Sequence, residues 1–251
     1  MFSRHSPTGT RIEGAVALVT GGHRGFGRAM VNELLERGAT KVYATSRSAQ
    51  PQRDERILPL VVDVTDSASV TAAANSAPDV SIVISSAGIA LGTPLLDTRL
   101  ADIRAELETN LFGLIRVARA FAPALGRHPT SSLVNVLSAA SWLALGDGYS
   151  ASKAAAWSAT NSLRTRLLEQ GTIVTALHVG YMDTDLTAGF DAPKADPADV
   201  ARQTTDAIIA GAFELIADES TRLVKAQLSE DLTSLYPQLS RGSARQGPST
   251  S

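Results

Sequence analysis

Apolar and β-branched residues gather in short runs along the chain, and longer mixed segments separate these runs. Six of the runs predict β-strands, at residues 15–20, 41–46, 58–62, 80–85, 132–137 and 173–178. The runs consist mostly of apolar and β-branched residues, which is typical of strands that helices cover on both faces. The pattern therefore predicts a parallel sheet in the interior of the protein.

The segments between the runs have the length and composition of helices. Helices are predicted at residues 26–37, 100–125, 154–168 and 197–212. Regular alternation of strand and helix favours an α/β fold, with a single Rossmann-like, doubly wound parallel sheet flanked by helices on both faces. We expect one domain at residues 14–240, after a flexible N-terminal segment at residues 1–13 and before a disordered tail at residues 241–251.

Composition excludes several classes of function. The 251 residues carry a net charge of −2, so there is no electrostatic reason to expect a nucleic acid or a membrane as partner. There is no cysteine, which excludes disulfides, thiolate metal sites and a cysteine nucleophile. The N-terminal residues lack an apolar signal sequence, and no apolar run reaches the ~18 residues of a membrane span. We therefore expect a cytoplasmic protein.

Two kinds of site are not expected. His5, His23, His128 and His178 are scattered without the spacing of metal ligands, so no metal site is predicted. The chain also lacks a GxSxG motif, which weakens a hydrolase interpretation of the α/β fold.

A glycine-rich motif stands where the first predicted strand meets the first predicted helix. It reads TGGHRGFG and covers residues 20–27. At such a junction the N-terminus of a helix can bind a nucleotide pyrophosphate, and glycines let the backbone turn tightly against the phosphates. In this context the motif predicts a dinucleotide-binding site.

Tyr149 and Lys153 lie four positions apart at the start of a predicted helix, so their side chains share one face. A free tyrosine has a pKa of about 10 and is a poor acid-base group at neutral pH. A nearby lysine cation favours the phenolate and would bring the pKa of Tyr149 toward neutral pH. The pair alone would also fit two surface residues of an amphipathic helix, but the rest of the chain favours acid-base catalysis.

Together the two motifs resemble those of the classical short-chain dehydrogenase/reductase family, in the forms TGxxxGxG and YxxxK. The similarity covers about residues 12–225, nearly the whole chain. Further family positions match in order: Asp63 at the adenine, SSAG at residues 85–88 for the usual NNAG, Asn110, Ser138, and GYMDT at residues 180–184 for PGxxxT. SSAG lacks the two amide side chains of NNAG, and we expect looser packing of that turn.

The resemblance implies a role for each matching residue. Ser138 would donate a hydrogen bond to a substrate carbonyl, and Tyr149 would deliver or accept the proton. Lys153 would lower the pKa of the tyrosine and hold the nicotinamide ribose, and Asn110 would support a water of a proton relay. The resemblance places the cofactor against Gly21, His23, Arg24, Gly25, Phe26, Gly27, Ser46, Arg47, Asp63, Val64, Ser86, Ala87, Gly88, Tyr149, Lys153, Gly180, Met182 and Thr184.

The position of the serine departs from the family pattern. Family members most often carry it thirteen residues before the tyrosine, whereas Ser138 precedes Tyr149 by eleven. The end of the predicted strand favours Ser138 and implies that the loop at residues 142–148 is about two residues short. Ser141 is the alternative.

The end of the second predicted strand indicates which dinucleotide binds. It reads Thr45, Ser46, Arg47 and has no acidic residue that would bind the adenosine ribose 2′-hydroxyl of NAD(H). Arg47 can contact a 2′-phosphate, and Arg24 lies where a second cation would face the same group. The pattern predicts NADP(H) as cofactor.

Apolar residues dominate the predicted substrate wall, at residues 89–91 and 139–145 with Tyr181, Met182, Leu186 and Phe190. They favour a hydrophobic or aromatic ketone or aldehyde, with residues 182–197 as a mobile lid.

The predicted function is an NADP(H)-dependent oxidoreductase that transfers a hydride between the nicotinamide and a small-molecule carbonyl or alcohol substrate. The alternatives are a non-catalytic NADP(H)-binding regulator and a family member that reduces another group, such as an imine. The resemblance also implies a homodimer or homotetramer, formed through the helices at residues 101–125 and 154–168.

Overall fold

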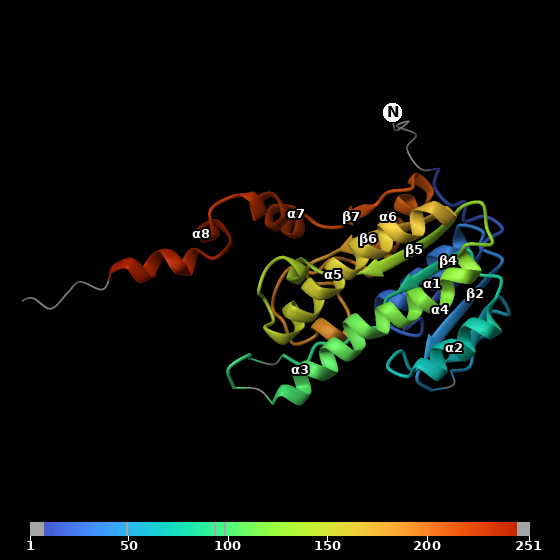
Figure 1. Cartoon of the computed structure of the whole chain (residues 1–251), viewed down its shortest axis with the longest axis horizontal. Coiled ribbons are helices and arrows are strands. Elements are labelled where there is room, and N and C mark those ends of the chain that lie inside the picture. The colour runs from blue at the N-terminus through green and yellow to red at the C-terminus, as the bar shows by residue number, and fades with distance from the viewer. Residues whose placement is uncertain (1–7, 49, 93, 98, 245–251) are drawn as a thin grey trace, which may run out of the picture.

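Seven parallel strands form one sheet at the centre of the protein (Figure 1). The structure is a computed structural model, and it describes residues 8–48, 50–92, 94–97 and 99–244. The strands are β1 (Val16–Val19), β2 (Lys41–Ser46), β3 (Ile57–Val61), β4 (Ile82–Ser85), β5 (Ser131–Val136), β6 (Thr172–His178) and β7 (Glu214–Ile216). Their order is β3-β2-β1-β4-β5-β6-β7, so the direction of winding changes between β1 and β4.

Helices cover both faces of this sheet, as its mostly apolar and β-branched strands predict. They are α1 (Gly25–Glu36), α2 (Ser67–Ser76), α3 (Leu100–Leu107), α4 (Leu114–Leu125), α5 (Gly148–Leu167), α6 (Pro197–Ala210), α7 (Glu219–Ala226) and α8 (Leu232–Leu235). Met30 of α1 and Ile208 of α6 are buried in one hydrophobic cluster with Val19 of β1. Phe121 of α4 is buried in a second cluster with Leu18. Adjacent residues of a strand point to opposite faces, so the two clusters lie on opposite sides of the sheet.

Three elements differ from those that the sequence pattern predicts. β7 has only three residues, too few to show a periodic pattern of apolar and polar positions. α2 is built mainly of alanine, serine and threonine, although Asp66 caps its N-terminus by accepting a bond from Ala68 N at 2.9 Å. The single helix predicted at residues 100–125 is divided, because the π-helix Glu108–Gly113 separates α3 from α4.

Residues 8–13 are packed against the domain, although they lie in the flexible segment predicted at residues 1–13. Thr10 is buried, and its backbone N donates to the carbonyl O of Ile208 at 3.0 Å. Its Oγ1 accepts a hydrogen bond from Ser132 Oγ at 2.8 Å. The packed domain therefore begins before the predicted boundary, while residues 1–7 lie outside the described residues.

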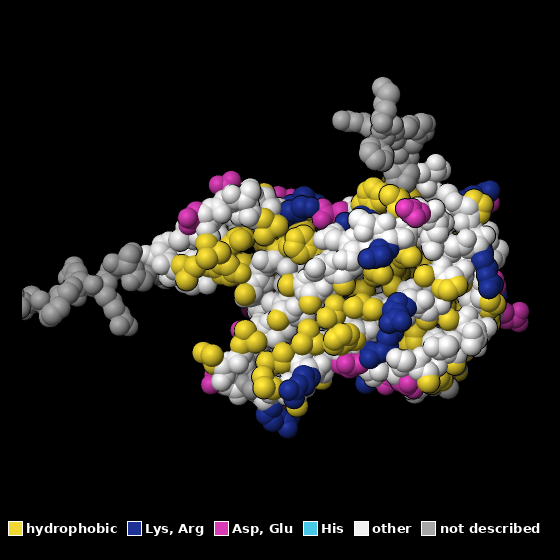
Figure 2. Space-filling view, viewed as in Figure 1, with side chains coloured by type: hydrophobic (Ala, Val, Ile, Leu, Met, Phe, Trp, Pro, Cys, Tyr) yellow, Lys and Arg dark blue, Asp and Glu magenta, His cyan; other side chains and the backbone are white. Residues whose placement is uncertain are grey.

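The C-terminal segment leaves the sheet after α7. In Figure 1, α8 and the 3-10 helix η6 (Pro237–Ala244) extend beyond the body of the protein, and Figure 2 shows hydrophobic side chains along this extension. Tyr236 Oη, between the two helices, accepts a hydrogen bond from Ala144 N at 3.0 Å and so ties the segment to the loop before α5. The disordered tail predicted at residues 241–251 begins inside η6, and its last part, residues 245–251, lies outside the described residues.

The turn from β1 into α1 brings two backbone segments into contact. A Cβ atom on Gly27 would lie 2.2 Å from the carbonyl oxygen of Gly21, and a backbone oxygen cannot move aside as a flexible side chain can. Gly21 itself has a φ of +68°, which favours glycine. The tight turn between β1 and α1 therefore requires glycine at these two positions.

We predict that Gly27→Ala lowers the free energy of unfolding by about 1–3 kcal/mol, the range for overpacking. The added methyl group would push α1 away from the turn. Gly189→Ala is the matched control, because nothing lies within 4 Å of a Cβ at that position. Chemical denaturation measures both variants, and equal stabilities would contradict the packing argument.

Candidate active site

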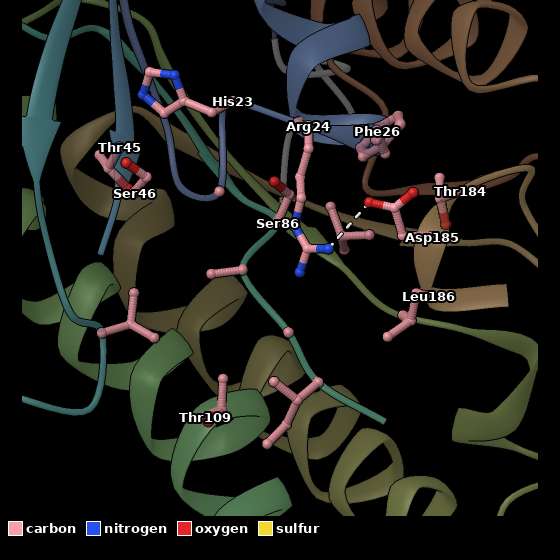
Figure 3. A pocket seen from close by; sticks show the side chains of 18 of the residues that line it. His23, Arg24, Phe26, Thr45, Ser46, Ser86, Thr109, Thr184, Asp185 and Leu186 are labelled. Carbon is pink, nitrogen blue, oxygen red and sulfur yellow. Dashed lines mark hydrogen bonds and ion pairs between the residues drawn. The ribbon is translucent and has the colours of Figure 1, made fainter. Parts of the chain in front are cut away.

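A pocket of about 630 Å³ opens at the carboxyl ends of the central strands, where the winding changes between β1 and β4. Ligands bind at this point in doubly wound sheets. Every residue of the predicted cofactor set lines the pocket, from Gly21 in the glycine-rich turn to Thr184 after β6. Figure 3 shows side chains from the glycine-rich turn, the end of β2 and the segment after β6 around the same space. The fold thus brings together residues that are far apart in the sequence.

The start of α1 is suited to binding an anion. Arg24, the residue before the helix, makes no side-chain cap, and the first turn contains no acidic residue. The first backbone N–H groups of the helix are therefore open to a negatively charged group, which the helix dipole also favours. A Cβ on Gly25 would lie 3.2 Å from Thr184 Cγ2, so glycine keeps this space free. These residues fit the pyrophosphate of a dinucleotide.

His23 lines the pocket, but both nitrogens of its ring already have partners. Nε2 lies 3.0 Å from the carbonyl O of Ala44, and Nδ1 lies 2.9 Å from Gln52 Nε2. The carbonyl can only accept and the amide nitrogen can only donate, so the imidazole proton is assigned to Nε2. Arg28 fixes the amide by donating to Gln52 Oε1 at 2.9 Å. The side chain of His23 therefore links the turn to β2. A cofactor at this position would contact the backbone of His23.

The two arginines of the predicted phosphate site have different partners. Arg24 NH1 lies 3.2 Å from Asp185 Oδ2, and both side chains are exposed at the mouth of the pocket (Figure 3). Arg47 also lines the pocket. Hydrogen bonds from Thr65 hold the pKa of the Asp63 carboxyl below its usual value, and the charge of Arg47 adds to this effect. A carboxylate of the loop after β6 thus engages Arg24, and the joint role of Arg24 and Arg47 at a 2′-phosphate stays a prediction.

Thr20 fixes the loop that follows β4. Its Oγ1 accepts hydrogen bonds from Ser86 N at 2.9 Å and from Ala87 N at 3.0 Å. Ser86 Oγ donates in turn to the carbonyl O of Thr20. The SSAG sequence therefore ties this loop through a serine hydroxyl and two backbone N–H groups, and the expected looser packing is not observed.

Asn110 lies in the π-helix between α3 and α4, a wider helical turn that is frequent at functional sites. Its Oδ1 accepts from Ile89 N, and its Nδ2 donates to Ile89 O and to Ser152 Oγ, each at 2.9 Å. Asn110 is buried and does not line the pocket. Its amide joins the loop after β4 to α5, while its support of a relay water stays a prediction.

Ser138 and Ser141 are both buried but have different surroundings. Ser138 lines the pocket, and its hydroxyl hydrogen-bonds with the phenol of Tyr149. Ser141 does not line the pocket, and its Oγ accepts a bond from Ser138 N at 3.4 Å. The structure therefore places Ser138 beside the tyrosine despite the spacing of eleven residues, and it gives Ser141 a capping role.

The short loop before α5 ends in a strained residue. Among the described residues, Asp147 is the non-glycine residue with a positive φ, +44°. Such a conformation costs on the order of 1–3 kcal/mol, and it persists only where the surrounding structure imposes it. Asp147 directly precedes the first turn of α5, which carries Tyr149 into the pocket.

Tyr149 and Lys153 begin α5 one turn apart, with Nζ of Lys153 5.6 Å from the centroid of the Tyr149 ring. Burial lowers the pKa of Lys153 to about 8, and Nζ donates to the carbonyl O of Val136 at 2.8 Å. Burial also raises the pKa of Tyr149 to about 12, against the opposite effect of the Ser138 hydrogen bond. Burial therefore outweighs any effect of Lys153, and the pKa of Tyr149 is not brought toward neutral pH as predicted. At pH 7 the site holds a protonated phenol beside an ammonium group.

The expected residues form only part of the substrate wall. Ile89, Met182 and Leu186 line the pocket. Ala139 and Ala140 do not, because they belong to a buried 3-10 turn after β5. This turn is therefore part of the core that supports Ser138.

The predicted lid at residues 182–197 is a loop pinned at its base. Asp183 N donates to the carbonyl O of Ala195 at 3.0 Å, and Ala195 N donates to Tyr181 O at 2.8 Å. The rings of Tyr181 and Phe190 stack with centroids 5.0 Å apart. The loop thus closes on itself beside the pocket.

Sequence reasoning missed Asp185 and Gln52, which belong to no motif and meet their partners only in the folded chain.

In the part of the chain that the structure describes, no group of three or more histidine, aspartate or glutamate residues could hold a metal ion. None of the helices there is long and apolar enough to cross a membrane.

Comparisons with known proteins agree with this site. A family model described as short chain dehydrogenase matches residues 15–195. Galactitol 2-dehydrogenase (L-tagatose-forming) of Cereibacter sphaeroides is 32% identical over 190 residues, 70% of this chain and 75% of that protein. The 3-oxoacyl-(acyl-carrier-protein) reductase FabG of Vibrio harveyi is 29% identical over 191 residues, 72% of this chain and 78% of that protein.

A solved structure is similar over almost its whole length. The crystal structure of a short chain dehydrogenase from Burkholderia cenocepacia J2315 in complex with NADP matches with a TM-score of 0.87 and 34% identity, over 92% of this chain and 99% of that chain. The family match also spans the glycine-rich turn, Ser138, Tyr149 and Lys153 together. The chain therefore belongs to the short-chain dehydrogenase family.

Proposed function

We propose that this protein is an NADP(H)-dependent oxidoreductase that acts on a carbonyl or alcohol substrate. The observation that carries the proposal is the meeting of Ser138, Tyr149 and Lys153 in the same pocket as the glycine-rich turn. When bound, the nicotinamide supplies or accepts the hydride. The protein has to hold the substrate carbonyl, stabilise negative charge on its oxygen and supply one proton.

Arg47 supports NADP(H) as the cofactor. It follows Thr45 and Ser46, so no carboxylate at the end of β2 would repel a 2′-phosphate or bind a free 2′-hydroxyl. A guanidinium can donate two parallel hydrogen bonds to such a phosphate. The Burkholderia relative, whose crystal structure contains NADP, supports the same choice.

Tyr149 supplies the proton. Because its pKa is about 12, the phenol is protonated at neutral pH and can donate as the carbonyl becomes an alkoxide. The hydroxyl of Ser138 donates to the same developing oxyanion. The ammonium group of Lys153 stabilises the phenolate that remains. This distribution of protons favours reduction at neutral pH.

Apolar side chains near the pocket favour a hydrophobic or aromatic ketone or aldehyde. Leu186 lines the pocket, and it is exposed by 45–52% together with Leu91, Leu145 and Phe190 of the predicted wall, so a hydrophobic substrate would cover such side chains. The names of the Cereibacter and Vibrio relatives point to different substrates, so neither name is carried over to this chain.

Tyr149→Phe is expected to lower kcat/KM for carbonyl reduction by about 10²–10⁴-fold, the range for loss of general acid catalysis. The substitution removes only a hydroxyl, so cofactor binding should be unchanged. NADPH oxidation over a panel of aromatic, aliphatic and steroid-like carbonyls measures the effect, and fluorescence titration measures NADPH binding. Tyr43→Phe is the control, because its hydroxyl bonds Asp79 and Tyr43 does not line the pocket.

Two outcomes would overturn this assignment. Equal activity of Tyr149→Phe and the unsubstituted protein on every accepted carbonyl would remove the tyrosine from the mechanism. NADPH binding without oxidation by any carbonyl would favour the non-catalytic regulator or the reduction of another group.

Arg47→Asp is expected to lower kcat/KM for NADPH by about 10–100-fold, because a charge-assisted hydrogen bond of about 1.5–3 kcal/mol is lost. The same carboxylate should improve the use of NADH, since it can accept a bond from the ribose 2′-hydroxyl. Steady-state kinetics with both cofactors measure the shift. Arg127→Asp, an exposed arginine before β5 at the other end of the sheet, should change neither value. Unchanged Michaelis constants in Arg47→Asp would defeat the assignment.

The pH dependence of reduction should report Lys153. Its pKa of about 8 means that kcat/KM falls as pH rises through that value, by up to about tenfold per unit, because the phenolate left on Tyr149 loses its cation. Tyr149 remains protonated over this range. Lys153→Arg keeps a cation at all these pH values. The kcat/KM of this variant should therefore not change with pH over this range, even where it is lower than that of the unsubstituted protein. An identical alkaline fall in both proteins would contradict the role of the lysine.

A further inference from the structure

His178 is a buried histidine to which the proposed reaction gives no part. It is the last residue of β6, and its side chain is fully buried. Its Nδ1 lies 3.2 Å from the carbonyl O of Ser138, just after the end of β5. The imidazole is thus in direct contact with the backbone of the residue that meets Tyr149.

The strand ladder holds the backbone on each side of Ser138 but leaves its carbonyl to other donors. Leu137 N donates to Leu177 O at 2.7 Å, and Ala139 N donates to Val179 O at 3.1 Å. Both bonds are ordinary continuations of the pairing of β5 with β6. The Ser138 carbonyl accepts instead from the imidazole and from Ser141 N, the latter at 3.0 Å.

Aromatic and charged neighbours fix the plane of the imidazole. The ring of Trp142 stacks on it, with centroids 3.8 Å apart and 18° between the planes. Lys225 Nζ lies 5.4 Å from the Trp142 ring and forms an ion pair with Glu214. Glu214 Oε1 lies 3.9 Å from His178 Nε2, and Arg164 acts on the histidine only through its more distant charge. The ring therefore has little freedom to turn.

The contacts also define the protonation of the ring. Burial lowers the pKa of His178 to about 4, so the imidazole is neutral at pH 7. A carbonyl oxygen faces Nδ1, so this nitrogen carries the proton. Nε2 is then an acceptor, and among the described residues it has no hydrogen-bond partner. The hydrogen bond from Nδ1 therefore selects this tautomer, although Nε2 remains unsatisfied.

We propose that His178 is a positioning residue for the hydride-transfer site, because its Nδ1–H fixes the Ser138 carbonyl and thereby the direction in which the Ser138 hydroxyl enters the pocket. The inference rests on the proposed function of Ser138. A rotation of the peptide after Ser138 would turn its side chain away from Tyr149. His178 opposes that rotation from the strand next to it.

The side-chain hydroxyl of Ser138 depends on the same fixed backbone. Its Oγ accepts a bond from Ala140 N at 3.1 Å, which leaves the hydroxyl proton to point toward Tyr149 or a substrate oxygen. This geometry exists only while the 3-10 turn after Ser138 keeps its orientation. A displacement of about 1 Å at a reacting group can cost on the order of 10²-fold in rate.

His178→Leu and His178→Asn test the proposal as a matched pair. The two replacements have nearly the same shape, but only asparagine keeps an N–H near the position of Nδ1. We expect His178→Leu to lower kcat for carbonyl reduction by about 10–100-fold with an unchanged Kd for NADPH, and His178→Asn to recover most of that loss. Equal kcat values for the two variants would overturn the proposal.

Measuring kcat for His178→Leu and His178→Asn in a Ser138→Ala background distinguishes a positioning role of His178 from a structural one. Because His178 is proposed to act through Ser138, His178→Leu should cause no further loss of kcat in that background. A further loss of the same size would overturn the proposal while leaving the proposed function intact. Full activity of Ser138→Ala alone would instead remove the serine from the proposed function.

Imidazole ¹⁵N chemical shifts of the unsubstituted protein give a test that does not depend on variant folding. A protonated Nδ1 and an unprotonated Nε2 are expected for His178 at pH 7. The opposite tautomer, or a doubly protonated ring, would overturn the proposal.

Discussion

A single buried hydroxyl joins the two strand ends between which the pocket opens. Thr20 Oγ1 accepts from Ser86 N and Ala87 N, and so ties the turn after β1 to the loop after β4. Helices leave these neighbouring strands toward opposite faces of the sheet, which is why a gap opens there. Asn110 holds the far end of the same loop and bonds Ser152 of α5. Hydrogen bonds across the gap therefore set the distance between the anion site of α1 and the residues of α5.

The order of the elements could be predicted from the sequence because the central strands are buried on both faces and consist mainly of apolar and β-branched residues. Elements that are held by other means were missed. α2 depends on a capping aspartate and on alanine, and β7 depends on pairing with β6, so neither leaves a strong periodic signal. The packing of residues 8–13 was missed for the same reason, since Thr10 is polar and is held by hydrogen bonds to distant residues.

The residues around the pocket could be predicted because a motif fixes positions along the chain. Their electrostatics could not, because a pKa depends on burial and on partners from other elements. Spacing suggested a lysine that acidifies a tyrosine, whereas burial acts on both groups and keeps Tyr149 protonated. Likewise, nothing in the glycine-rich motif indicates that Arg24 meets Asp185, 161 positions further along the chain.

The bond between Tyr236 and Ala144 has a consequence for how the protein is made. Ribosomes deliver the chain from the N-terminus, and domains begin to fold as their segments emerge. Ser138, Tyr149 and Lys153 leave the ribosome well before Tyr236, whose hydroxyl closes the loop in front of them. A nascent chain therefore displays the glycine-rich turn and the tyrosine–lysine pair while the loop beside them still lacks its last anchor. The loop in front of the tyrosine gains this anchor only after Tyr236 has been synthesised.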